Sequence, residues 1–211
     1  MQKKNYRLIV SMVLLAFTYV ICFFGMVSNS FPEIFRYLVP FTILLSVVVL
    51  CIFHQSWNRG VIFTLTIVIV AGFGIEAAGR HTGLIFGSSS FGNSLGWKLF
   101  DTPLIIGVNW LLLVYITHVA VRQIGIERPW IELTAAAIIT ALDYLMEPVA
   151  IRYDLWHWEN NIIPVQNFFA WFYISFFMQL FFNQMKPVKE NQVAIPLLVL
   201  QIVFYAALNI F

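Results

Sequence analysis

The sequence predicts an all-α integral membrane protein: a single polytopic membrane domain over residues 1–211, built as a bundle of about seven transmembrane helices. Three observations predict this fold class. Hydrophobic residues make up 61% of the chain and charged residues only 10%. The mean hydropathy is +0.85. The apolar runs are also long, close to the roughly 20 residues that a helix needs to cross a bilayer.

Seven apolar runs are the expected helices, and several prolines mark where they begin or end. The runs cover Leu8–Ser28, Tyr37–Phe53, Val61–Ala78, Pro103–Val121, Ile131–Glu147, Val165–Phe182 and Val193–Phe211. Pro103 and Pro196 fit first turns, where proline removes no intrahelical hydrogen bond, and Pro148 follows the fifth run. No internal repeat or linker divides the chain, so one domain is expected.

The connection between the third and fourth runs is rich in glycine. Five of the chain's eleven glycines lie between Gly79 and Gly96, among them the aromatic residues Phe86 and Phe91. An outer loop of this length and composition is typical of a lid or re-entrant segment over an apolar ligand. A plain flexible loop is the alternative interpretation.

The distribution of Lys and Arg predicts how the bundle crosses the membrane. With the N-terminus inside, the inner segments hold eight Lys and Arg residues and the outer segments four. This excess favours an N-terminus inside and a C-terminus outside, in what we expect to be a bacterial cytoplasmic membrane. Because the basic residues are scattered, the net charge of +2 indicates no nucleic-acid partner. Membrane lipid is the expected surrounding.

The most informative residues are two carboxylates, Asp143 and Glu147, at the end of the fifth run. Their spacing of four places both on one helix face. An ionised side chain at the bilayer centre costs roughly 2.5–3.5 kcal/mol, so the pair must be neutralised, solvated or used in catalysis. Two close carboxyls in a poorly solvated site do not both ionise easily, and one would keep its proton as a general acid. An ordinary interfacial position at a helix end is the alternative.

Other rare polar residues are predicted to lie at the same end of the bundle. Glu76 and Arg80 are four residues apart, which suits either a structural ion pair or a catalytic site in which Glu76 donates the proton. Candidates for binding substrate or water are Arg80, His81, Asn109, Trp110, Asp154, Trp156, His157 and Trp158. Since the opposite end carries only scattered polar residues, we expect one cavity that opens near the outer face.

Trp156 and Trp158 alternate around His157. In an extended segment both indole rings would point the same way. Their faces would stabilise a carbocation through the ring quadrupole. An aromatic belt at the membrane interface is the alternative interpretation.

Several chemistries lack their residue patterns in this sequence. The four histidines form no H-x-x-H, H-x-x-x-H or H-E-x-x-H set, which argues against a di-iron oxygenase. No paired Asp-rich motif is present that would hold a magnesium diphosphate, which argues against a prenyltransferase. We therefore expect neither a metal nor a cofactor.

Several ordered motifs between residues 74 and 158 resemble the carotenoid biosynthesis membrane protein family. They are Gly74 to Gly87 with Glu76-Ala-Ala-Gly79-Arg80-His81, then Asn109-Trp110, Ala141-Leu142-Asp143, Glu147-Pro148 and Trp156-His157-Trp158. The chain departs from the family pattern at Ser88-Ser89-Ser90, where tyrosines are common, and at Gly107, where proline is common. These departures bear on which carotenoid is used.

The resemblance implies a cofactor-free hydratase, similar to bisanhydrobacterioruberin hydratase, that adds water to the terminal double bond of an acyclic carotenoid end group. A lipophilic carotenoid would be the substrate, and other carotenoid-pathway enzymes are possible partners. Two alternatives stay open. The same protonation would begin ring closure in an end-group cyclase, and a non-catalytic carotenoid-binding or transport protein would use the same apolar bundle.

Overall fold

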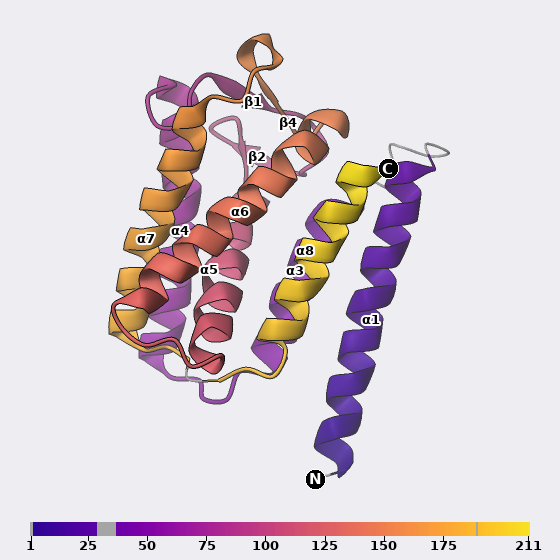
Figure 1. Ribbon diagram of the computed structural model, residues 1–211, viewed down its shortest axis with the longest axis vertical. Helices are drawn as coiled ribbons and strands as arrows, with labels where there is room; N and C mark the ends of the chain where they lie inside the picture. Colours follow the sequence, from indigo (N-terminus) through magenta and orange to yellow (C-terminus); the bar gives the residue numbers. More distant parts are fainter. Residues whose placement is uncertain (1, 29–36, 189) are drawn as a thin grey trace.

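The computed structural model describes residues 2–28, 37–188 and 190–211 and confirms an all-α bundle (Figure 1). Its helices are α1 (Gln2–Val27), α3 (Leu38–Ile52), α4 (Arg59–Thr82), α5 (Ile105–Gln123), α6 (Trp130–Arg152), α7 (Val165–Met185) and α8 (Ala194–Ile210). Short strands are β1 (Ser89–Phe91), β2 (Lys98–Leu99), β3 (Thr102–Pro103) and β4 (Trp156–Trp158), and one 3-10 turn, η1, covers Glu159–Asn161. The start of α1 and the end of α8 lie at opposite ends of the bundle.

Within the described residues, five of the seven helices are long and apolar enough to cross a membrane: α1, α4, α5, α6 and α7. Helices α3 and α8 are apolar but have only 15 and 17 residues. At about 1.5 Å per residue, α3 is roughly 22 Å long, short of the hydrocarbon core of about 30 Å. The protein is thus an integral membrane protein by its helices, with fewer full-length spans than the seven expected.

Helix α5 is the centre of the bundle and packs against α3, α4, α6, α7 and α8. Every residue from Ile105 to Val121 except Val108 is buried. A close approach of α4 to α5 depends on Gly72, because a Cβ atom there would lie 2.5 Å from the Cβ of Trp110. This contact brings Glu76, one turn further along α4, next to the indole of Trp110.

Helices α6 and α7 form the most extensive helix pair and carry the opposite wall of the site. The predicted end of the fifth helix at Glu147 was wrong, because α6 continues through Pro148 to Arg152. Proline at this position leaves the carbonyl of Tyr144 without its helical donor, and Tyr144 lies on an exposed face of the helix. The extra turn moves Glu147 away from the helix end and into the bundle.

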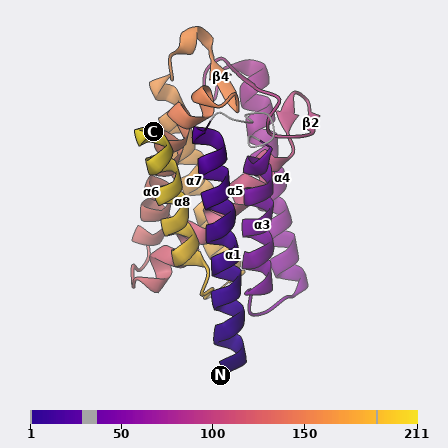
Figure 2. The ribbon, with the colours of Figure 1, turned by 90° about the vertical axis from the view of Figure 1, so that its right-hand side faces the viewer.

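The connections α4–α5 and α6–α7 cover one end of the bundle, which we call the site end (Figures 1 and 2). Strand β1 pairs antiparallel with β4, with Phe91 opposite Trp156 and Ser89 opposite Trp158. Gly92 allows this pairing, since a Cβ atom there would lie 2.0 Å from the backbone oxygen of Asp154. The glycine-rich connection is therefore folded onto the second connection over the site.

Candidate functional site

A cavity lies between α4, α5, α6 and α7 at the site end, and we call it the interior cavity. Three carboxyls and one guanidinium line it: Glu76, Arg80, Asp143 and Glu147. The remaining lining side chains are two amides and six apolar or aromatic groups: Asn109, Asn167, Phe86, Phe91, Ile106, Met146, Trp156 and Trp171. Charged groups from separate helices thus meet in an otherwise mostly apolar pocket.

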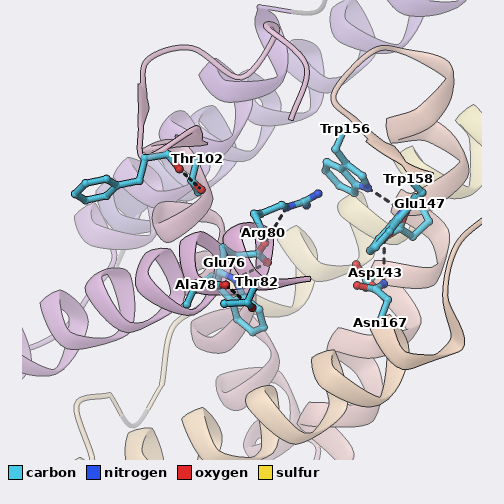
Figure 3. A network of polar contacts seen from close by, with 12 residues as sticks. Glu76, Ala78, Arg80, Thr82, Thr102, Asp143, Glu147, Trp156, Trp158 and Asn167 are labelled. Atoms are coloured by element: carbon cyan, nitrogen blue, oxygen red, sulfur yellow. Dashed lines mark hydrogen bonds and ion pairs between the residues drawn. The ribbon is translucent and has the colours of Figure 1, made fainter. Parts of the chain in front are cut away.

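The α6 carboxyls share one donor from α7. The amide nitrogen Nδ2 of Asn167 donates to Oδ2 of Asp143 at 2.9 Å and to Oε1 of Glu147 at 3.1 Å (Figure 3). Asp143 is 0% exposed and Glu147 is 1% exposed. These values remove the alternative of an interfacial carboxylate pair facing bulk water.

Glu147 receives two further hydrogen bonds from β4. The indole nitrogens of Trp156 and Trp158 both donate to its Oε2, at 3.0 and 2.6 Å. The alternation expected around His157 is confirmed, because both indoles are buried on one side of the strand and His157 lies on the other. The two rings therefore belong to the site, and their N–H groups bind a carboxylate.

Glu76 and Arg80 form the wall on α4. Oε2 of Glu76 lies 3.7 Å from Nε of Arg80, an ion pair too long for a hydrogen bond. Oε1 of Glu76 accepts from Nε1 of Trp110 at 3.3 Å, and Trp110 stacks on Trp171 with ring centroids 4.1 Å apart. Arg80 extends from α4 toward β4, between Glu76 and Trp156 (Figure 3).

Two lining groups have polar atoms without a hydrogen-bond partner among the described residues. They are Nε and Nη1 of Arg80 and Oδ1 of Asp143, all buried. The cavity offers about 20 Å³ to the centre of a water molecule, and about 10–15 Å³ suffices for one water. The cavity is thus large enough for one water molecule, and residues with unpartnered polar atoms line it.

The structure brings most of the predicted site residues together, although not all of them. Asn109 lines the cavity, and Trp110 reaches it through Glu76. His81 lies in a neighbouring hollow. Asp154 and His157 pair with each other at 2.6 Å with side chains 44% and 42% exposed, and neither lines the cavity.

Sequence reasoning missed Asn167, Met146, Ile106 and Trp171 as lining residues. Asn167 had a usable signal, since it is an amide two residues inside a predicted span, and an amide in hydrocarbon needs a partner. The apolar residues carried no signal that distinguishes a cavity wall from ordinary helix packing. Phe86 and Phe91, noted as loop aromatics over an apolar ligand, do line the cavity.

The expectation that rare polar residues gather at one end was incomplete. Further from the site, Nδ1 of His118 on α5 lies 2.9 Å from Oε1 of Gln179 on α7. Near the opposite end, Nδ2 of Asn183 donates to Glu132 at 2.6 Å. Each of these pairs joins side chains from two different helices, and such contacts across a helix interface are not visible in the linear sequence.

Fold and site together define a polytopic membrane protein with a buried acidic, water-sized cavity. Among the described residues, no group of three or more His, Cys, Asp or Glu side chains is arranged to hold a metal ion. The model of the carotenoid biosynthesis protein family matches residues 35–211, and the chain belongs to this family. No curated protein and no solved structure gives a significant match.

Proposed function

We propose that this member of the family is a hydratase that adds water to the terminal double bond of an acyclic carotenoid end group, without a cofactor. The observation that carries the proposal is the buried set of three carboxyls and one arginine around a space for one water molecule. Hydration needs an acid, a water molecule and stabilisation of a cation. Each of these requirements has a candidate in the cavity.

Asp143 is the proposed general acid. Glu147 accepts three hydrogen bonds, all from groups that can only donate, so its surroundings favour the carboxylate. Asp143 accepts one hydrogen bond and its Oδ1 has no partner. A site with all three carboxyls ionised would leave two negative charges uncompensated by Arg80, and each buried unpaired ion costs several kcal/mol. The proton is therefore best held on Asp143.

The reaction balances without any other reagent. The Asp143 proton bonds to the less substituted alkene carbon, its O–H bond breaks, and a tertiary cation forms. Glu147 and the indole faces stabilise that positive charge. The water that Arg80 and Asp143 hold forms the C–O bond, and its spare proton returns to the Asp143 carboxylate. The net change is one water added to one double bond.

The substrate is proposed to arrive laterally from the lipid, because a carotenoid is too apolar to cross the aqueous phase. The interior cavity has room for water and not for an end group. Binding therefore needs the apolar lining side chains, such as Met146 and Phe86, to move apart. A pathway partner that hands over the pigment is compatible with this requirement.

Expression in a host that produces acyclic carotenoids tests the function. Mass spectrometry of the extracted pigments is expected to show the mass of one water added per modified end. An isomeric ring of unchanged mass would make the protein a cyclase. Unchanged pigment that copurifies with the protein would make it a binding protein.

The proposed orientation has the N-terminus inside and the C-terminus outside, in a bacterial cytoplasmic membrane. The excess of Lys and Arg in the segments on the N-terminal side supports it. Reporter fusions after residue 211 test it: a reporter active only outside the cytoplasm is expected to be active there. Activity of a cytoplasmic reporter instead would reverse the orientation.

A further inference from the structure

A second, larger hollow adjoins the interior cavity among the connections at the site end, and we call it the loop chamber. Arg80 and Phe91 line it together with His81, Ser89, Lys98 and Asp101. It offers about 340 Å³ to water, against about 20 Å³ in the interior cavity. Arg80 and Phe91 line both spaces, so these two side chains form the wall between them.

The two sides of this wall differ in polarity. On the chamber side are hydroxyl, imidazole, ammonium and carboxylate groups, which suit bulk-like water. On the cavity side, the Phe91 ring faces a pocket that it shares with Trp156 and Met146. Phe91 itself is 8% exposed. The chamber therefore has room for many water molecules one side chain away from the carboxyls, whereas the interior cavity has room for about one.

The wall is held in place from three directions. The guanidinium carbon of Arg80 lies 3.8 Å from the centroid of the Phe91 ring, a close cation–π contact. The ammonium of Lys98 donates to the backbone oxygen of Phe91 at 2.8 Å. Phe91 also pairs with Trp156 between β1 and β4, and the two rings meet edge to face. The ring position thus depends on the loop fold and on the charge of Arg80.

We propose that Phe91, positioned by Arg80, is a specificity-determining residue that meters water from the loop chamber into the interior cavity. This inference rests on the proposed hydration. A tertiary cation that meets a water forms a C–O bond and becomes an alcohol. A cation without water loses a proton from a neighbouring carbon to the Asp143 carboxylate and leaves as an isomer. Alternatively, it bonds to another double bond of the same chain, and the new ring cation then loses a proton to the same carboxylate.

Metering matters because too much water is as harmful as too little. One water beside Asp143 suffices to capture the cation. A fully hydrated cavity would instead solvate the carboxyl and favour its ionised form, which cannot donate a proton. The wall therefore lets the same pocket hold a neutral acid and still receive the reactant that the acid step requires.

Thiol labelling tests the wall independently of any reaction. The chain would carry Cys22→Ala, Cys51→Ala and a reporter thiol from Asn109→Cys, since Asn109 lines the interior cavity and not the loop chamber. With a small water-soluble methanethiosulfonate reagent, Phe91→Ala is expected to speed labelling about tenfold or more, because thiol reactivity follows exposure. The matched control is Met146→Ala, which enlarges the cavity from α6 without opening the chamber.

Equal labelling rates with and without Phe91→Ala would overturn the proposal, as would an equal acceleration by Met146→Ala. A second variant tests the consequence for the products. Phe91→Trp is expected to lower the ratio of alcohol to isomers about tenfold by narrowing the water path. Phe100→Trp is its control, because Phe100 lines only the chamber and is 64% exposed.

The two arms separate the failure of this inference from failure of the proposed function. If the unaltered protein forms no alcohol, the hydratase proposal fails, and the labelling rates still decide whether Phe91 is the wall. If alcohol forms and Phe91→Trp leaves its share unchanged, the hydratase proposal stands and the metering role of Phe91 is wrong.

Discussion

Two glutamates on α6 each accept a hydrogen bond from an asparagine on α7, one at each end of the bundle. At the site end, Asn167 donates to Glu147 at 3.1 Å. At the opposite end, Asn183 donates to Glu132 at 2.6 Å. Glu147 and Glu132 are 1% and 2% exposed. Burial and an amide partner are therefore common to both and do not distinguish a reactive site from a structural one.

The surroundings of the two glutamates differ in their balance of charge. Glu132 lies 3.2 Å from Nε of Arg128, whose side chain is 55% exposed, so this carboxylate has its own cation at the edge of the bundle. Glu147 shares one arginine with two other carboxyls around a closed, water-sized space. An excess of carboxyls over cations in a closed cavity is the feature that points to proton chemistry.

The largest effect is expected at Asp143. Asp143→Asn removes the proton donor and keeps the shape, so alcohol formation is expected to fall at least about 100-fold, the lower end of what a general acid contributes. Pigment analysis and a thermal unfolding scan would be measured on the same preparation. The control Asp154→Asn alters a half-exposed carboxylate outside the cavity and is expected to keep normal activity. Normal turnover by Asp143→Asn would remove this residue from the mechanism.

The next largest effect is expected at Glu147. Glu147→Gln removes a charge that stabilises the cation and presents an amide that cannot accept from Trp156, Trp158 and Asn167 together. Activity is expected to drop about 10- to 100-fold, at or below the roughly 100- to 1,000-fold that one lost electrostatic group costs. Measuring substrate affinity by pigment absorbance sharpens the comparison with Asp143. An unchanged affinity with a lower turnover would place the effect of Glu147→Gln in the reaction and not in substrate binding. An unaltered turnover would contradict the electrostatic role.

The sequence predicted the helices well and the site in part, for a physical reason. Long apolar runs and flanking prolines depend on local chemistry, so the main helices were expected at nearly the observed places. The spacing of Asp143 and Glu147 gave one helix face of the site. The partner of that face, Asn167, lies 24 residues along the chain from Asp143, and nothing in the spacing indicates that pairing.

The differences between expectation and structure have the same origin. Pro148 was interpreted as a helix end because proline removes a local donor, whereas α6 continues to Arg152, whose guanidinium donates to the backbone oxygen of Leu208 on α8. Asp154 and His157 were grouped with the site by proximity in sequence. The alternation of β4, which the sequence did predict for an extended segment, turns His157 away from Trp156 and Trp158 and toward Asp154.

A smaller effect is expected at Trp158. Trp158→Phe keeps the ring and removes a 2.6 Å hydrogen bond to Glu147, and hydrogen bonds to charged groups contribute about 1.5–3 kcal/mol. The unfolding free energy in detergent is expected to fall by about that amount, with activity reduced less than in the Glu147 variant because Trp156 still donates. Trp57→Phe, at a half-exposed position beside His54, is the control. Equal losses in both variants would mean that the Trp158 bond has no particular role.

The smallest effect on activity is expected at the opposite end of the bundle. Glu132→Gln keeps an oxygen that can accept from Asn183, and Arg128 reaches solvent once its partner is neutral. Alcohol formation is therefore expected to stay within about twofold of the unaltered protein, because a change of less than about 0.4 kcal/mol in the barrier corresponds to that range. Pigment analysis beside the Glu147→Gln variant checks this. A loss as large as that of Glu147→Gln would show that buried glutamates at both ends serve the reaction, and the charge-balance criterion would fail.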